Sequence, residues 1–222
     1  MVTGGNTRGM LRGGMAGTTP NGDLTVSLTT KTAIDLPNDD LGPDDGPLGL
    51  RDLIREDWAR HGREIGSAGM HALVLHRIGH EALRRDGLGW TVVRKVYNKV
   101  NRLWIRNVYG VELPPEATIG RRVYIPHAFG IAIDEQAVVG DDCLVRHRVT
   151  LGRTADASGA PRLGRNVSLG AGAVVAGDVY VGDDVVIGPN AVVLSDVPDG
   201  ATAFGPPARI LRPQPRSERR AE

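Results

Sequence analysis

The stretch from residue 119 to residue 193 places a branched aliphatic residue at every sixth position, with two interruptions. Glycine directly follows many of these residues, as in Ile119-Gly120 and Val139-Gly140. Helices repeat every 3.6 residues and strands every two, so neither explains a period of six. A solenoid of short parallel strands does, because three hexads close one triangular coil and each coil buries its aliphatics against its neighbours. The aliphatic positions are Ile119, Ile125, Ile133, Val139, Val145, Leu151, Leu163, Leu169, Val175, Val181, Ile187 and Val193.

Two irregularities interrupt this rhythm. The spacing from Ile125 to Ile133 is eight residues, so two extra residues lie between them. The spacing from Leu151 to Leu163 is twelve, and residues 153–160 are polar or rich in glycine and alanine. The second segment is predicted to form a loop outside the coil. Insertions in solenoids commonly form the binding face, so both breaks mark a candidate cleft.

The regions flanking the repeat differ from it in composition. Residues 1–46 are rich in Gly, Thr, Asp, Asn and Pro, which predicts a disordered N-terminal tail. Helical spacing of apolar residues over 47–110 predicts an α-helical domain, and 111–211 form the repeat domain. Residues 212–222 are predicted to be a flexible, charged C-terminal tail. The last expected helix, 90–109, has an apolar side formed by Val92, Val93, Val96, Val100, Leu103, Trp104 and Val108.

Composition narrows the functional classes. The net charge of +1 favours neither nucleic acid nor an anionic membrane as a partner. No apolar stretch is long enough to span a bilayer, and the N-terminus lacks the apolar run of a signal peptide. Cys143 is the single cysteine, which fits a reducing compartment, so we expect a cytoplasmic protein. Because Cys143 occupies the small inward position of the repeat, we expect a buried thiol rather than a nucleophile.

Three residues carry candidate chemistry. His127 and His147 each lie two positions after a core aliphatic, one turn of the coil apart once the inserted pair is allowed for. They are expected on the same wall, separated by roughly the 4.8 Å between neighbouring strands. Glu112 precedes the first full coil and is placed to swing under His127. A carboxylate bonded to one imidazole nitrogen makes the other a better base, which suits proton removal from a hydroxyl.

The order of several motifs resembles the serine acetyltransferase family of hexapeptide-repeat acyltransferases. The resemblance covers about residues 50–211 and includes the helical segment around His71-Ala72-Leu73. A six-residue repeat alone indicates only a β-solenoid, whereas the His–Gly segment, the Val-Thr-Leu-Gly turn and the exit motif in one order are more specific. These stretches are Gly110-Val111-Glu112-Leu113, His127 followed by Gly130-Ile131, Val149-Thr150-Leu151-Gly152, Gly170-Ala171-Gly172-Ala173 and Gly205-Pro206-Pro207-Ala208-Arg209.

The resemblance implies a mainly β fold, a left-handed parallel β-helix of hexapeptide repeats preceded by a small α-helical domain. It implies a homotrimer, or a dimer of trimers if the helices pair, that binds acetyl-CoA between subunits. His127 takes the position of the general base that deprotonates the acceptor hydroxyl, and Glu112 that of the acid that orients it. The family usually has Asp at the second position. The expected acetyl-CoA contacts are Gly152, Gly170, Ala171, Gly205 and Arg209.

The acceptor side departs from the family pattern. Pro126 stands where an Asp usually precedes the catalytic histidine, and Gly159-Ala160 stand where Arg-His usually precedes a proline. The absence of this Asp and of the Arg-His pair removes charge-assisted bonds to the amino and carboxylate groups of serine. Arg146, His147 and Arg148 are candidate substrate-binding residues, or else an ordinary stacking histidine between solvated arginines. Pro189 falls where many members have Ala, so one backbone donor to CoA is absent.

Several functions therefore stay open. The first is acetyl transfer from CoA to serine or a serine-like molecule, and the second is transfer to a sugar or specialised-metabolite hydroxyl. A zinc hydratase of the gamma carbonic anhydrase type needs three histidines, and the repeat contains only two, so no metal is expected. A non-catalytic trimeric scaffold is the fourth. His71, His76 and His80 are expected to serve packing or subunit contact. The sequence ends without the terminal isoleucine through which typical members bind cysteine synthase, so no such complex is expected.

Overall fold

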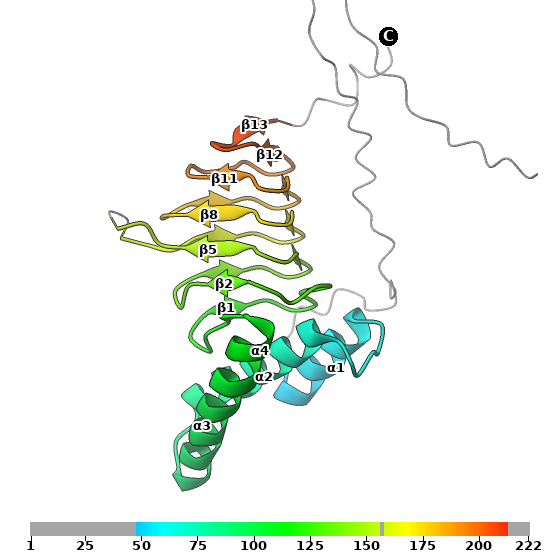
Figure 1. Cartoon of the computed structure of the whole chain (residues 1–222), viewed down its shortest axis with the longest axis vertical. Helices are drawn as coiled ribbons and strands as arrows, with labels where there is room; N and C mark the ends of the chain where they lie inside the picture. Colours follow the sequence, from blue (N-terminus) through cyan, green and yellow to red (C-terminus); the bar gives the residue numbers. More distant parts are fainter. Residues whose placement is uncertain (1–47, 156–157, 213–222) are drawn as a thin grey trace, which may run out of the picture. The chain divides into compact units, whose positions relative to one another are not determined.

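The computed structural model describes residues 48–155 and 158–212, so most of both predicted tails lies outside it. Helical elements come first along the chain, and strands follow (Figure 1). α2 begins after Ser67, whose side chain accepts a hydrogen bond from the Met70 backbone N–H. The helical elements are α1 (Leu50–Arg60), α2 (Ala68–Arg84), α3 (Leu88–Val100), the π-helix η1 (Asn101–Arg106) and α4 (Asn107–Tyr109).

The strands stack as three sheets that form the walls of a parallel β-helix, as the repeat predicts. Every pairing between strands is parallel except that of β12 with β13. The first sheet contains β1 (Thr118–Ile119), β3 (Val138–Val139), β6 (Arg162–Leu163) and β9 (Tyr180–Val181). The second contains β4 (Leu144–Val145), β7 (Ser168–Leu169), β10 (Val186–Ile187), β12 (Thr202–Phe204) and β13 (Arg209–Leu211). The third contains β2 (Ala132–Ile133), β5 (Thr150–Gly152), β8 (Val174–Ala176) and β11 (Val192–Val193).

The repeating aliphatics fill the interior of the coils. Leu151, Leu169 and Ile187 are at most 1% exposed, which confirms the assignment of the core from the repeat. Cys143 is also fully buried, and burial raises the pKa of its thiol to about 12. The thiol donates a hydrogen bond to the Gly164 carbonyl at 3.3 Å. Cys143 is therefore the inward structural thiol that the repeat predicts.

The turns of the β-helix form two edges that differ in their side chains. The charged edge consists of the turns 120–122, 140–142, 164–166, 182–184 and 198–200, which lead from the first sheet to the second. The histidine edge consists of residues 126–130, 146–148, 170–172, 188–190 and Gly205, which follow strands or bridge residues of the second sheet. Equivalent turns lie one coil apart, because the strands that precede them pair in register.

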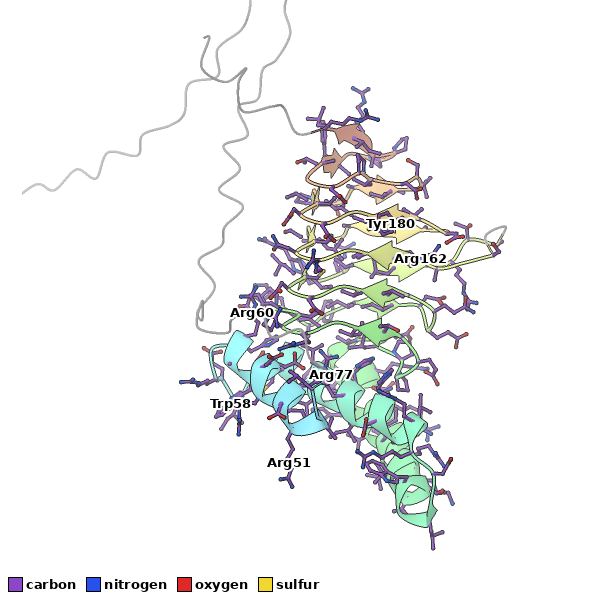
Figure 2. All side chains as sticks on the ribbon, turned by 180° about the vertical axis from the view of Figure 1, so that it is seen from behind. Arg51, Trp58, Arg60, Arg77, Arg162 and Tyr180 are labelled. Atoms are coloured by element: carbon purple, nitrogen blue, oxygen red, sulfur yellow. The ribbon has the colours of Figure 1, made fainter. Side chains whose placement is uncertain are left out.

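Side chains of the helices cover the first coil, which has no coil beneath it. The guanidinium of Arg77 donates to the carbonyls of Ile119 and Gly120 and pairs with buried Asp57 at 3.0 Å (Figure 2). His76 Nε2 donates to the Ala117 carbonyl at 3.2 Å. These bonds satisfy backbone groups that an open end of a solenoid otherwise leaves unpaired.

The histidines of α2 serve packing, one of the two roles expected from the sequence. His76 is buried, and burial lowers its pKa from 6.5 to about 3. His80 Nδ1 donates to the Pro115 carbonyl at 2.8 Å, so both histidines contact the segment that leads into the first coil.

The apolar side expected for residues 90–109 is not the side that the fold buries, because six of its seven residues are exposed. Tyr97 and Ile105 are buried, whereas Val92, Val96 and Trp104 are more than half exposed. The helix also begins two residues earlier than expected, at Leu88. Periodicity identified an amphipathic helix, but α3 packs against α2 through one of its apolar faces while the other stays uncovered.

Candidate active site

His127 and His147 meet on the histidine edge. Their ring centroids are 6.1 Å apart and the ring planes make an angle of 64°, an edge-on contact between consecutive coils. The backbones of the two turns are joined because Arg148 N–H donates to the Phe129 carbonyl at 2.8 Å. The structure thus brings together the two histidines that the repeat placed on one wall.

The inserted residues shape the turn that carries His127. Gly130 adopts a φ of +64°, and an added Cβ would lie 3.3 Å from the Arg148 side chain, so the turn closes tightly over the next coil. His127 is exposed, and its imidazole forms no hydrogen bond with any other residue that the structure describes. Both ring nitrogens are therefore available to a ligand.

Glu112 does not contact His127 in a single chain. Its backbone pairs with the strand that follows His127, because Ile133 N–H donates to the Glu112 carbonyl at 2.9 Å. Its carboxylate instead lies 3.8 Å from Nε of Arg106 on η1, and both side chains are about 60% exposed. The orienting role of Glu112 thus stays a prediction. Sequence reasoning missed Arg106, since no periodicity links a π-helix to the entry of a solenoid.

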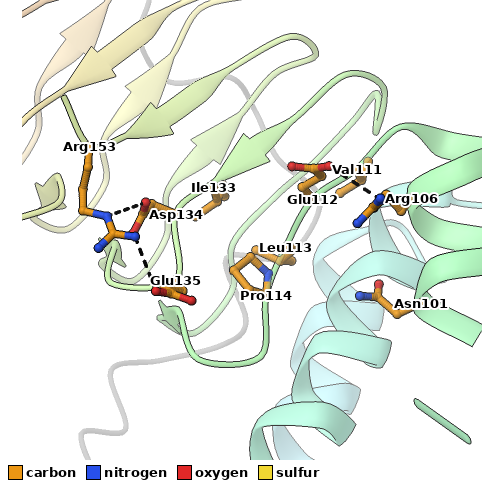
Figure 3. A pocket seen from close by; sticks show the side chains of 10 residues that line it. All are labelled: Asn101, Arg106, Val111, Glu112, Leu113, Pro114, Ile133, Asp134, Glu135 and Arg153. Atoms are coloured by element: carbon orange, nitrogen blue, oxygen red, sulfur yellow. Dashed lines mark hydrogen bonds and ion pairs between the residues drawn. The ribbon is translucent and has the colours of Figure 1, made fainter. Parts of the chain in front are cut away.

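A hollow of about 390 Å³ adjoins Glu112 (Figure 3). Arg153 closes one side of it and pairs with Asp134 at 2.9 Å and Glu135 at 3.4 Å. His127 does not line the hollow, so the hollow is not by itself the acceptor site around the general base. The lining residues are Asn101, Arg106, Val111, Glu112, Leu113, Pro114, Ile133, Asp134, Glu135 and Arg153.

Arg146 and Arg148 lie on either side of His147. Both are exposed, and neither guanidinium forms an ion pair with a carboxylate in the described part of the chain. Arg148 has a φ of +59°, the left-handed conformation that recurs at this position of the turns. The two arginines therefore give the histidine edge positive charge that no acidic side chain of the described chain neutralises.

The residues expected to contact acetyl-CoA are spread over successive coils. Gly170 and Ala171 occupy the turn above His147, and Gly172 N–H donates to the His147 carbonyl at 2.9 Å. Gly205 lies on the last coil, where its carbonyl accepts from Val192 N–H at 3.0 Å. Arg209 lies in β13, opposite Phe204. Gly152 ends β5, farther along the wall from the edge.

The reasons for glycine at these positions differ. A Cβ on Gly170 would lie 2.5 Å from the Pro189 nitrogen, so the next coil already requires glycine there. A Cβ on Gly152 would meet only the Thr150 methyl carbon at 3.7 Å, an ordinary contact. Packing within the chain therefore does not explain Gly152.

Comparisons with known proteins agree with this geometry. Residues 160–195 match the family described as bacterial transferase hexapeptide (six repeats). A serine acetyltransferase from Synechococcus elongatus is 39% identical over 161 residues, which cover 71% of this chain and 63% of that protein. One from Helicobacter pylori is 41% identical over 145 residues, which cover 64% of this chain and 81% of that protein.

Solved structures give the same result. Soybean serine acetyltransferase complexed with serine is 32% identical with a TM-score of 0.63, covering 73% of this chain and 69% of that one. The Brucella abortus serine acetyltransferase in complex with coenzyme A is 29% identical with a TM-score of 0.61, covering 73% of this chain and 66% of that one. The chain belongs to the serine acetyltransferase family. Its β-helix is accordingly left-handed, as the resemblance implies.

The acceptor side of His127 lacks the charged residues that the resemblance leads one to expect there. Pro126 is half-buried and supplies no charge beside the imidazole. The segment before Pro161 bends toward Asp178, since a Cβ on Gly159 would lie 2.7 Å from that carboxylate. Across residues 48–155 and 158–212, no three His, Cys, Asp or Glu side chains converge as a metal site.

Proposed function

We propose that the protein is a CoA-dependent O-acetyltransferase that acts on the hydroxyl of serine or of a serine-like small molecule. The observation that carries the proposal is the exposed, unbonded imidazole of His127 beside His147 on one edge of the β-helix. The relatives named as serine acetyltransferases support the reaction type, and the soybean and Brucella complexes support serine and coenzyme A as ligands.

In the proposed reaction His127 removes the proton of the acceptor hydroxyl as the oxygen attacks the thioester carbonyl of acetyl-CoA. The new C–O bond replaces the C–S bond, and the imidazolium passes the proton to the departing thiolate, which leaves as the thiol of CoA. Glu112 orients His127 once its carboxylate leaves Arg106, and its chain is one methylene longer than the usual Asp. Gly152, Gly170, Ala171, Gly205 and Arg209 hold the CoA moiety in this proposal.

The proposed site is shared between subunits of a homotrimer, or of a dimer of trimers. This model is supported by the exposure of His127, which does not line the hollow beside Glu112. A neighbouring subunit would complete the walls of the cleft. The single buried cysteine supports a cytoplasmic location, where thiols stay reduced.

A second acceptor class, a sugar or specialised-metabolite hydroxyl, is favoured by specific residues. Pro126 and Gly159-Ala160 lack the charged groups that bind an amino acid, whereas Arg146 and Arg148 offer exposed cations on the same edge. Guanidinium groups bind carboxylate or phosphate oxygens in a bidentate manner. The arginines therefore fit an acceptor that carries an anionic group.

The test is to measure free CoA released from acetyl-CoA with serine, homoserine and nucleotide sugars assayed side by side. We expect turnover with one acceptor class, and loss of that turnover in His127→Ala. The matched control is His71→Ala, which removes an imidazole from α2 and should keep the rate. Full CoA release by His127→Ala with the preferred acceptor would show that this imidazole is not the general base. If none of the acceptors tested causes release of CoA, both acceptor classes are rejected.

A further inference from the structure

The α3–η1–α4 segment presents an uncovered apolar surface, which we call the valine face. Its side chains are between 42% and 85% exposed, although all are large and apolar. Contiguous exposed apolar patches on soluble proteins mark sites of interaction with other proteins or with membranes. The valine face consists of Leu88, Val92, Val96, Val100, Leu103, Trp104 and Val108.

The π-helical turn keeps this face continuous. Residues four apart drift around a regular α-helix, because four residues exceed the 3.6 of one turn. In η1 the hydrogen bonds span five residues, so the chain winds less per residue and the drift is partly reversed. Val96, Val100 and Trp104 therefore stay aligned with Val108. Trp104 Nε1 donates to Tyr109 Oη at 3.3 Å, which satisfies its one polar group.

The charge of the segment is entirely positive. Residues 87–111 contain five Lys or Arg side chains and no Asp or Glu. Arg94 donates to the Ala82 carbonyl, and Arg106 pairs with Glu112. Lys95, Lys99 and Arg102 are exposed and form no ion pair with any residue in the described ranges. Three cations thus lie on the same segment as the valine face without an ion-pair partner among residues 48–155 and 158–212.

This charge pattern decides between two occupants of the valine face. Two copies of the segment packed face to face would bring cations against cations, with no acidic side chain on either helix to compensate. An anionic lipid surface accepts both features at once, because apolar side chains enter the acyl boundary while Lys and Arg contact headgroups. Tryptophan is enriched at that boundary, which fits the exposed ring of Trp104.

We propose that the α3–η1–α4 segment docks the protein on anionic lipid surfaces, with the valine face in the acyl boundary and Lys95, Lys99 and Arg102 on the headgroups. The net charge of +1 does not indicate a membrane partner, because acidic residues elsewhere in the chain balance the cations of this segment. The docking is peripheral: no helix in the described part of the chain is long and apolar enough to cross a membrane. The inference is independent of the acceptor.

The test is co-sedimentation of the purified full chain with vesicles of phosphatidylcholine alone, or of phosphatidylcholine mixed with phosphatidylglycerol. We expect binding to the mixed vesicles only, weakening as salt is raised. Each Lys or Arg near an anionic surface raises the partition coefficient between membrane and water roughly five-fold. Lys95→Glu/Lys99→Glu changes the charge of the segment by four units and should therefore lower the partition coefficient by roughly 600-fold. The charge control is Arg51→Glu, an exposed cation of α1 (Figure 2).

The apolar contribution is tested with Val96→Glu, matched by Leu194→Glu on the β-helix, since each side chain is 57% exposed. Val96→Glu should abolish vesicle binding and Leu194→Glu should leave it unchanged. Failure of the chain to bind mixed vesicles, or equal losses in both variants, would overturn the proposal. If Val96→Glu instead lowers the mass measured by sedimentation without vesicles, a second copy covers the face and the lipid proposal is wrong.

Discussion

The charged edge and the histidine edge are turns of the same β-helix, yet their polar side chains have opposite surroundings. On the charged edge, side chains are bonded to the adjoining coil: Arg122 forms two hydrogen bonds to Asp142, and Asn166 bonds Asp184 at 2.7 Å. On the histidine edge, Arg146, His147 and Arg148 form no side-chain hydrogen bond within the described residues.

The difference separates residues that hold the coils in register from residues that are available to ligands. Over its first four turns the charged edge alternates sign from coil to coil, with Arg121-Arg122, Asp141-Asp142, Arg165-Asn166 and Asp183-Asp184, whereas the fifth turn carries Asp199. A slip by one coil would place like charges against each other, which is unfavourable. The histidine edge lacks such bonds, so its side chains keep their hydrogen-bonding capacity for a substrate.

The largest expected effect is on catalysis at the histidine edge. His127→Ala should lower kcat for acetyl transfer by about 10²–10⁴-fold, the usual contribution of a general base. The unfolding free energy should change by less than about 0.5 kcal/mol, because the side chain is exposed and unbonded. Steady-state kinetics and urea unfolding of the same preparation measure both. A large loss of stability would show that the histidine edge also holds the fold.

The converse is expected at the charged edge. Asp142→Ala removes both bonds from Arg122 and places alanine at a φ of +59°. We expect the unfolding free energy to fall by about 2–3 kcal/mol, with acetyl transfer unchanged. Asp142→Asn is the matched control, since asparagine tolerates this φ and still accepts a hydrogen bond. Its unfolding free energy should fall by less than that of Asp142→Ala. A reduced kcat in folded Asp142→Ala would show that the charged edge also contributes to catalysis and that the two edges do not have separate roles.

Buried His76 should make the stability of the protein depend on pH. Burial lowers the pKa of His76 from 6.5 to about 3, so the unfolded chain binds a proton first as the pH falls. Stability should therefore be lost between pH 6.5 and about 3, by at most about 1.4 kcal/mol per pH unit from this group. Unfolding midpoints measured across this range should show a shallower slope in His76→Gln. An identical slope would exclude His76 as the source.

The smallest expected effect concerns Cys143, next to the charged edge. Because burial raises the pKa of its thiol to about 12, the native protein should not react with a thiol reagent at pH 8. The unfolded chain should react fully, so the slow native reaction measures opening of the coil. Asp142→Ala should accelerate it more than Asp142→Asn does. Rapid labelling of the native protein would mean that the coil opens readily there.

The sequence predicted the core well because the six-residue repeat is a local signal. The positions of Leu151, Leu169 and Cys143 follow from counting residues, and so does the proximity of His127 to His147. The pairing of Arg122 with Asp142 is visible in the sequence only after the coils are aligned. Even then, no local sequence signal distinguishes a turn whose side chains hydrogen-bond to the next coil from a turn whose side chains do not.

The helical segment was predicted less completely. Apolar periodicity gave the helix over 90–109 but did not show which apolar face is covered, because that depends on the packing of α2. The bond of Arg77 to the first coil joins residues more than 40 positions apart, and the contact of Arg106 with Glu112 joins the end of η1 to the segment that follows α4. Such contacts have no periodic signature.

By itself the sequence determined that the chain folds as a β-helix and which residues lie inside it. Each coil can bury its aliphatics only on the next coil, so the repeat admits one solution. Tertiary structure alone decided which polar side chains are neutralised, which stay free for a ligand, and that α3 keeps a valine face in solvent. Those outcomes depend on the distances between side chains from different coils and helices, and chain order does not fix these distances.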